Sequence, residues 1–340
     1  MDFFTYIEEQ MKLQRVIPFP QSGLDYLKGP PPKNKHLLAF HNDLVKFIRR
    51  IVPNSTDVAV RQHIIKLLQQ RIMSAFSSKE IVICAPCGSC LSGTFLPNAD
   101  IDIALFLYPT NENPRQTMDT IMDCLHGLAY PDSFTPLPNA KVPVLKFSVI
   151  PGIQIDLSID ELHGPLSVMT VRQIFEENPC MLPAQLFLKT LLYHSDLDQP
   201  YTGGISSYTL QIMLLAYIQH AGTPDNITDL IIGFMHFYGK QFNFVTTGID
   251  VKNHGSLFSR EKENCISYES PTTMHIRDPL NPNNILGHNS FKMPQIRDEL
   301  SMAYDIISTG SGSSYLARLE THVIQFEETQ KKLDDYCKTL

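Results

Sequence analysis

Two carboxylates separated by one residue carry the clearest chemical signal in this 340-residue chain. Asp100 and Asp102 flank a single isoleucine at the start of an apolar run. Alternate side chains of a β-strand point the same way, so both carboxylates would face one side of a sheet. Adjacent like charges repel, and hard oxygen ligands suit Mg²⁺ or Mn²⁺. The pair therefore predicts a divalent-metal site, with a polar strand end as the alternative.

A glycine-serine turn precedes this pair at short range. Gly88 and Ser89 follow a strand-like segment over residues 80–84 and open a short helix. Backbone amides at such a turn form a ready anion site. A phosphate site beside a metal site is what phosphoryl or nucleotidyl transfer requires. The two patterns together favour that chemistry more strongly than either pattern alone.

A later predicted strand carries a further aspartate as a candidate third carboxylate. Residues 153–159 alternate apolar and polar side chains, as a half-buried strand does, and Asp156 lies on the polar face. Asp160, at the end of this strand, is the alternative. A partner strand is expected over residues 142–150, joined through Pro151 and Gly152.

Three cysteines overlap the glycine-serine turn with the spacing C-x2-C-x2-C. A metal bound by Cys84, Cys87 and Cys90 would obstruct a phosphate there, and no fourth ligand is nearby in the sequence. Seven cysteines without framework spacing indicate reduced thiols. We therefore favour free thiols over a zinc or iron–sulfur site.

The order of strand, Gly-Ser turn, Asp-x-Asp and distant Asp resembles the nucleotidyltransferase superfamily of DNA polymerase beta. Two later blocks resemble the eukaryotic terminal nucleotidyltransferases that extend RNA 3′ ends, in particular poly(A) polymerases of the TRAMP type. The first block begins at Leu188-Lys189 and ends in Thr202-Gly203-Gly204-Ile205-Ser206-Ser207-Tyr208, and the second is Asp278-Pro279 through Phe291. The resemblance covers about residues 36 to 308.

This resemblance implies an α+β fold with two lobes and a cleft between them. A small mixed α/β catalytic lobe would span residues 57–161. A mainly helical, poly(A)-polymerase-associated central lobe would comprise residues 36–56 and 162–340, with a nucleotide recognition motif at 276–291. Residues 1–35 are expected to form an N-terminal arm, either docked on the helical lobe or a partner, or solvated.

The resemblance also implies a reaction. An RNA 3′ hydroxyl would attack the α-phosphate of a nucleoside triphosphate and release pyrophosphate, with two Mg²⁺ or Mn²⁺ ions held by Asp100, Asp102 and Asp156. The residues expected to bind the nucleotide are Gly88, Ser89, Lys189, Ser207, Tyr208 and Asn284. Lys189 would contact phosphates, although a solvated helix face is the alternative for it. Adenosine-preferring relatives carry Asn at the position of Asn284 and uridine-preferring ones His, which favours ATP, with terminal uridylyl transfer as the alternative.

The formal net charge of −7 is unusual for a free-standing RNA binder. We therefore expect protein partners to supply RNA contacts, in an exosome-cofactor complex or in an RNA-dependent RNA polymerase complex of RNA silencing. No secretory signal or membrane span is evident, which favours the nucleus, with the cytoplasm as the alternative. The rival functions are a nucleotidyltransferase with a small acceptor and an inactive scaffold subunit.

The helical lobe is expected to be built from amphipathic helices. The first ends before Pro53, and Thr56 or Asp57 would cap the next. A Gly/Ser hinge is expected over residues 309–314. The expected helices are 36–51, 60–73, 114–128, 182–194, 210–220, 227–238, 295–307 and 315–337.

Overall fold

The chain divides into two compact units, each of which is described by itself. We call residues 1–19, 52–172 and 325–340 the mixed unit, and residues 20–51 and 173–324 the helical unit. The structure, a computed structural model, describes residues 15–76, 81–108, 113–150, 152–159, 163–252, 255–266 and 271–338. Within that part of the chain no helix is long and apolar enough to cross a bilayer.

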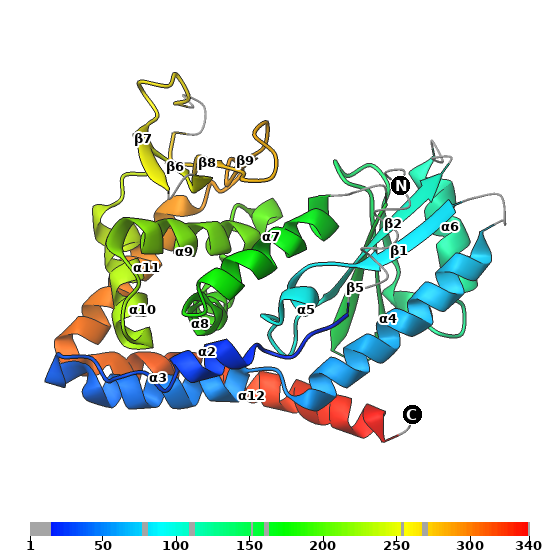
Figure 1. Cartoon of the computed structure of the whole chain (residues 1–340). Helices are drawn as coiled ribbons and strands as arrows, with labels where there is room; N and C mark the ends of the chain where they lie inside the picture. Colours follow the sequence, from blue (N-terminus) through cyan, green and yellow to red (C-terminus); the bar gives the residue numbers. More distant parts are fainter. Residues whose placement is uncertain are drawn as a thin grey trace. The chain divides into compact units, whose positions relative to one another are not determined.

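The mixed unit is built on one five-stranded sheet (Figure 1). β2 and β5 are its central pair and run parallel, whereas the other neighbouring strands are antiparallel. Every second residue of β5 is buried, as the alternating sequence predicts. In spatial order the strands are β1 (Ile81–Pro86), β2 (Ile101–Tyr108), β5 (Ile153–Ile159), β4 (Val144–Ile150) and β3 (Thr135–Leu137).

Two helices of this unit pack together against the sheet (Figure 1). α4 (Ser55–Ala75) and α6 (Pro114–Cys124) contribute Ile64, Leu68 and Met118 to one apolar core with the strands. The sequence predicts the cap of α4 at Thr56 or Asp57, two or three residues too late. Its N-cap is Asn54, and Asp57 completes a capping box with it.

Segments from both ends of the chain complete the mixed unit. Val16 is buried in its core, and its backbone N–H donates to Gln62 Oε1. At the other end, Leu333 of α12 (Gly312–Cys337) is 1% exposed in the same core. Residues 325–340, which we had assigned to the helical lobe, thus belong to the mixed unit. Val16 and Phe19 of the arm are thus buried rather than solvated; residues 1–14 lie outside the described part.

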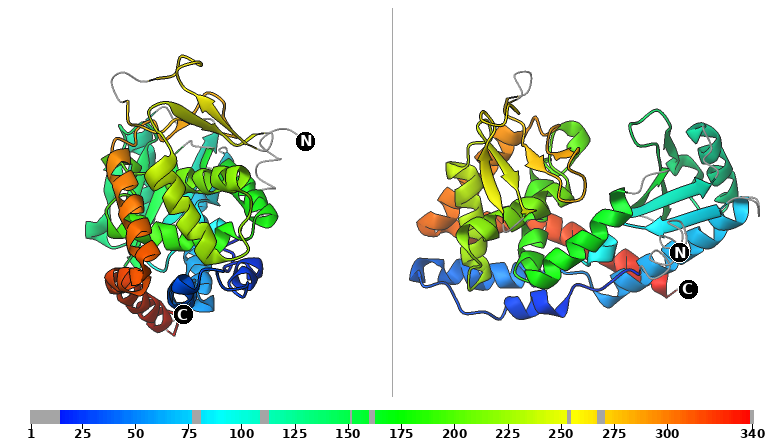
Figure 2. Two further views of the ribbon diagram at one scale, coloured as in Figure 1. Left: turned by 90° about the vertical axis from the view of Figure 1, so that its left-hand side faces the viewer. Right: turned by 45° about the horizontal axis from the view of Figure 1, so that its top comes forward.

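The helical unit is formed mainly by helices that pack through apolar faces (Figure 2). α8 and α9 are buried almost all round, as expected of central helices. The α-helices are α2 (Gln21–Tyr26), α3 (Leu38–Ile51), the end of α7 (His163–Glu177), α8 (Met181–His194), α9 (Ser207–Ala221), α10 (Ile227–His236), α11 (Met293–Ile306) and the start of α12.

A kink between two helices lies where the sequence predicts a Gly/Ser hinge, over residues 309–314. A π-helical turn (Ile307–Ser311) connects α11 to α12, with Gly310 at φ 89°. A Cβ placed on Gly312 would lie 2.5 Å from the Phe40 ring. The glycines are required there for a tight turn and a close approach to α3.

A small four-stranded sheet completes the helical unit (Figure 2). Its strand order is β7 (Ser256–Ser259), β6 (Thr247–Asp250), β8 (Ile276–Arg277) and β9 (Ile285–Leu286). Strands β8 and β9 pair antiparallel within the 276–291 motif. Residues 278–284 therefore form the loop of a β-hairpin whose two strands are β8 and β9.

Candidate active site

The register of the two central strands brings two of the predicted carboxylates together. Asp102 of β2 stands directly beside Asp156 of β5 in the parallel pairing. Neighbouring strands lie about 4.8 Å apart, and paired residues point to the same face. Both residues are partly exposed. These acids, 54 positions apart in sequence, thus form one carboxylate pair that solvent can reach.

The glycine-serine turn lies against this pair. Gly88 adopts φ 67°, and a Cβ placed on it would lie 2.0 Å from Asp102 Oδ2. The backbone N–H of Cys87 donates to the carbonyl oxygen of Asp102 at 2.9 Å. Ser89 begins α5 (Ser89–Ser92). A residue without a side chain is therefore required for the turn to approach Asp102 this closely.

Asp100 precedes β2 by one residue and is exposed. Its backbone carbonyl accepts a hydrogen bond from Cys90 Sγ at 3.8 Å. Within the described ranges no three His, Cys, Asp or Glu side chains are gathered closely enough to hold a metal ion as they stand. Asp160, the alternative third acid, lies outside the described residues.

A lysine that the sequence analysis did not select stands in the same row. Lys146 of β4 pairs with Asp156 across the strands, and its Nζ lies 2.5 Å from Asp156 Oδ2. Gln154 Nε2 donates to the other carboxylate oxygen at 2.8 Å. Asp102, Asp156 and Lys146 therefore form a row across three adjacent strands in which an ammonium group supplies positive charge.

The donor set fits a hard divalent cation. Carboxylates on adjacent strands supply oxygen ligands. Asp102 and Asp156 would hold an ion between them, and Asp100 would join as a ligand from the strand end. For Asp156 to ligate fully, its contact with Lys146 has to loosen, because a cation and an ammonium group compete for the same oxygen atoms.

Replacing Lys146 by methionine is expected to tighten Mn²⁺ binding about 10-fold, since an opposite charge at contact distance shifts a carboxylate's ion affinity by at least about one logarithmic unit. Mn²⁺ titration followed by electron paramagnetic resonance measures the affinity. Lys141→Met is the matched control, since it removes one exposed positive charge from the same unit. Weaker Mn²⁺ binding by Lys146→Met would show instead that Lys146 holds Asp156 in its ligating position.

The three cysteines around the turn are all buried, and none of them forms a disulfide. Complete burial raises the pKa of the Cys84 thiol to about 12, so this thiol stays protonated at neutral pH. Metal ligation requires the thiolate. The buried thiols pack against the strands, and Cys90 adds its hydrogen bond to Asp100.

In the helical unit, α8 and α9 bring two of the predicted nucleotide contacts into one region. Gln185 Nε2 on α8 donates to the carbonyl oxygen of Ser207, the first residue of α9, at 3.3 Å. Lys189 follows Gln185 by one helical turn, so it lies on the same face of α8. Lys189 is partly exposed. Burial raises the pKa of the nearby Asp198 carboxyl, and the positive charge of Lys189 partly offsets this by lowering that pKa.

Asp278 connects two predicted base contacts. Its Oδ1 accepts from the Tyr208 hydroxyl at 3.0 Å, and its Oδ2 accepts from Asn284 Nδ2 at 2.8 Å. The backbone N–H of Leu280 donates to Oδ1 as well. Asp278 is 1% exposed. Burial raises the pKa of Tyr208, so the phenol remains a neutral donor. Asp278 therefore fixes the ring of Tyr208 and the orientation of the Asn284 amide.

Asp278→Asn is expected to raise the KM for the nucleotide about 10-fold with a smaller change in kcat. An amide cannot accept at its nitrogen, so Tyr208 or Asn284 loses a hydrogen bond to a charged group. Initial rates at varied nucleotide concentration measure both constants. Asn281→Ala, which removes a side-chain acceptor from Asn283 N in the same loop, is the control and should leave KM within about twofold of wild type.

Comparison with known families decides the identity of the fold. A model of the poly(A) RNA polymerase, mitochondrial-like, central palm domain matches residues 40–169. The Cid1 family poly A polymerase model matches residues 226–284, and the two together cover more than half of the chain. Both models describe poly(A) polymerase domains, so the chain is similar to this family over these two segments. The resemblance to TRAMP-type enzymes that the sequence blocks indicated is confirmed.

Curated relatives of this family are long proteins. The chain is 25% identical over 312 residues to poly(A) RNA polymerase CID14 of Cryptococcus neoformans, covering 88% of this chain and 40% of that protein. A Drosophila melanogaster relative, the inactive poly(A) RNA polymerase protein Trf4-2, is 26% identical, covering 75% of this chain and 65% of that protein. The chain therefore spans about 40% of the length of CID14.

Solved structures of this family share the fold. The polymerase core of TRAMP, an RNA surveillance complex, superposes with a TM-score of 0.71 at 19% identity, covering 91% of this chain and 96% of that one. The Cid1 poly(U) polymerase with MgGTP bound gives a TM-score of 0.64 at 16% identity, covering 78% and 94%. The expected α+β nucleotidyltransferase fold, with a mixed unit and a helical unit, is confirmed.

Proposed function

We propose that this chain is an RNA nucleotidyltransferase that adds nucleotides, preferentially AMP from ATP, to RNA 3′ ends without a template. The observation that carries the proposal is the register that places Asp102 beside Asp156, with the Gly88 turn against Asp102. CID14 of Cryptococcus neoformans is a poly(A) RNA polymerase, which supports RNA as the acceptor.

In the proposed reaction the mixed unit supplies the metal ligands. Two Mg²⁺ or Mn²⁺ ions, when bound, would neutralise phosphate charge and lower the pKa of the attacking 3′ hydroxyl. Asp100 and Asp102 would hold both ions, and Asp156 would hold the one beside the hydroxyl. The backbone of Gly88 and the Ser89 hydroxyl would orient phosphate oxygens.

The helical unit would bind the nucleotide. Lys189 and Ser207 would contact the triphosphate, which suits a compact cation and a hydroxyl. Tyr208 would stack on the base, a contact worth roughly 1–3 kcal/mol. The Asn284 amide, oriented by Asp278, would meet the donor and acceptor edge of adenine.

We further propose that protein partners supply most of the RNA affinity. The formal net charge of −7 gives the chain little long-range attraction for phosphates. A TRAMP polymerase core is among the similar structures, and it comes from an RNA surveillance complex. An RNA surveillance or RNA-silencing assembly in the nucleus would provide such partners.

The test offers each of the four nucleoside triphosphates separately to the purified chain with a labelled RNA primer and Mg²⁺ or Mn²⁺. Primer extension that depends on metal and is longest with ATP is the expected result. Longest extension with UTP would make the chain a uridylyltransferase. Absence of extension with every nucleotide and both metals would overturn the enzyme and favour the scaffold role; one relative, Trf4-2, is an inactive polymerase protein.

A further inference from the structure

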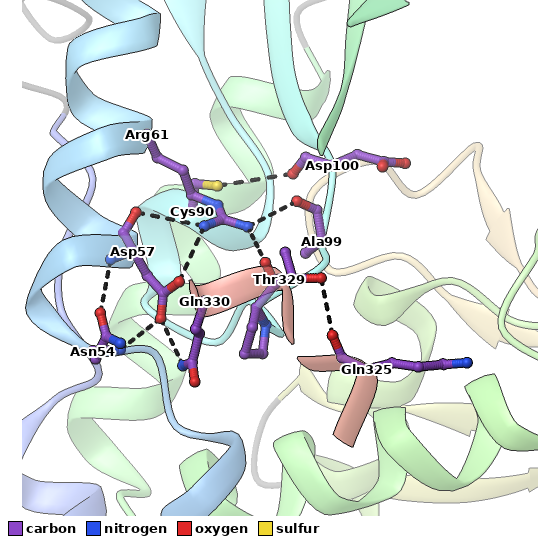
Figure 3. A network of polar contacts seen from close by, with 10 residues as sticks. Asn54, Asp57, Arg61, Cys90, Ala99, Asp100, Gln325, Thr329 and Gln330 are labelled. Atoms are coloured by element: carbon purple, nitrogen blue, oxygen red, sulfur yellow. Dashed lines mark hydrogen bonds and ion pairs between the residues drawn. The ribbon is translucent and has the colours of Figure 1, made fainter. Parts of the chain in front are cut away.

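A fully buried arginine holds the turn that leads into the carboxylate pair (Figure 3). Arg61 of α4 is 0% exposed, and its Nη2 donates to the carbonyl oxygens of Pro97 at 2.7 Å and Ala99 at 3.1 Å. Asp100 follows directly. A planar guanidinium presents several donors in a rigid fork, so it can hold more than one carbonyl in fixed positions.

The guanidinium is itself held on its other sides. Its Cζ lies 4.6 Å from the centroid of the Phe95 ring, and Nη1 lies 3.8 Å from Asp57 Oδ1. Asp57 is also 0% exposed. It accepts from Asn54 N and from Gln330 Nε2, both at 2.8 Å. Since Gln330 belongs to α12, a residue near the end of the chain braces the ion pair of α4.

The hydrogen bonds from Arg61 to the turn determine the direction of the Asp100 side chain through the backbone. Figure 3 shows the Asp100 carboxylate pointing away from Arg61, while its carbonyl faces Cys90. The N–H of Ala99 donates to Leu96 O at 2.8 Å, which closes the turn. The direction of the Asp100 side chain is thus determined by peptide groups whose carbonyls Arg61 binds.

We infer that Arg61 is a positioning residue for the metal ligands: it fixes residues 97–100 so that Asp100 and Asp102 point at the divalent ions, and Asp57 with Gln330 holds Arg61 in place. The inference rests on the proposed function, because it takes these aspartates as metal ligands. Partners that orient metal ligands from behind typically contribute about 10- to 100-fold to metal affinity or activity.

The test compares Mn²⁺ binding to folded variants, by electron paramagnetic resonance, in the absence of RNA and nucleotide. The principal variant is Asp57→Leu combined with Arg61→Met, which removes both buried charges together and so leaves neither unpaired. Arg61→Lys is the second variant, since it keeps the charge but loses the fork. The control is Gln69→Leu: Gln69 lies on the same helix and donates to the Cys84 carbonyl of β1 instead of to the turn.

The double variant is expected to raise the Mn²⁺ Kd about 10-fold with an unchanged number of sites, and Arg61→Lys to raise it about threefold. Gln69→Leu should stay within about twofold of wild type. If Arg61 were needed only for folding, fewer molecules of the variant would be folded, so fewer Mn²⁺ sites would be counted per chain while the Mn²⁺ Kd of the folded molecules stayed unchanged. In extension assays, excess Mn²⁺ should restore most of the lost rate.

A wild-type Kd in the double variant would overturn the inference, as would an equal rise in Gln69→Leu. Should the double variant not fold, a wild-type Kd in Arg61→Lys overturns it. A wild-type chain that binds Mn²⁺ through Asp100 and Asp102 but extends no RNA would refute the proposed function alone. A chain in which Asp100→Ala with Asp102→Ala leaves Mn²⁺ binding unchanged would overturn both.

Discussion

Replacing Asp100 and Asp102 together by alanine is expected to lower the rate of nucleotide addition by at least roughly 1,000-fold. Without these ligands the metal ions do not bind, so the negative charge that develops on the phosphate in the transition state is not neutralised. The fold should survive, since one acid is exposed, the other is partly exposed, and their mutual repulsion disappears. Single-turnover extension of a labelled primer measures the loss. Thermal unfolding shows whether the variant is folded.

The matched control replaces Asp123 and Asp132 by alanine. Both are exposed residues of the mixed unit, so the change in net charge is the same. Extension should remain within about twofold of wild type, as expected of surface substitutions. Undiminished addition by a folded Asp100→Ala, Asp102→Ala variant would remove the assignment of these two residues as metal ligands.

Lys189→Met is expected to lower kcat/KM for the nucleotide about 100-fold, since a charged hydrogen bond to a phosphate is worth roughly 2–3 kcal/mol. Most of the effect should appear in KM if Lys189 binds the triphosphate equally well before and during the reaction. Lys240→Met is the control, because Lys240 carries the same charge in the same unit and pairs with Asp305 at the surface. A change in kcat/KM of less than about threefold would show instead that Lys189 only lies on a solvated helix face.

The sequence predicted the central strands of the mixed unit well because their periodicity is regular. Residues 153–159 were expected as one strand, and β5 has these bounds. The pairing of Asp102 with Asp156 could be anticipated only through the family resemblance, because no local pattern states which strands become neighbours across 54 residues.

Lys146 was missed because a β-bulge changes the register of the hairpin. Counting from the Ile150–Ile153 pair places Phe147 opposite Asp156, but the register shifts between Ser148 and Ile150 and brings Lys146 there instead. The signal was present in the sequence. Val149 and Ile150 are consecutive apolar residues, which break the alternation of the strand and are both buried.

Arg61 and Asp278 were missed for a different reason. Both are charged residues in positions where polar side chains usually face water. Arg61 continues the buried stripe of Ile64 and Leu68 along α4, with Asp57 four positions before it. That opposite charge on the buried face was the available signal. Asp278 was noted only as part of a turn-rich motif, and nothing in the spacing showed that it would hold Tyr208.

The mixed unit contains segments from the beginning, the middle and the last part of the chain. During synthesis on the ribosome, the strands with Asp102 and Asp156 emerge long before Leu333 and Gln330 become available to pack against them. The nascent strands must therefore wait, incompletely covered, until α12 has been translated. Chaperone protection during that interval should matter more for this unit than for the contiguous bulk of the helical one.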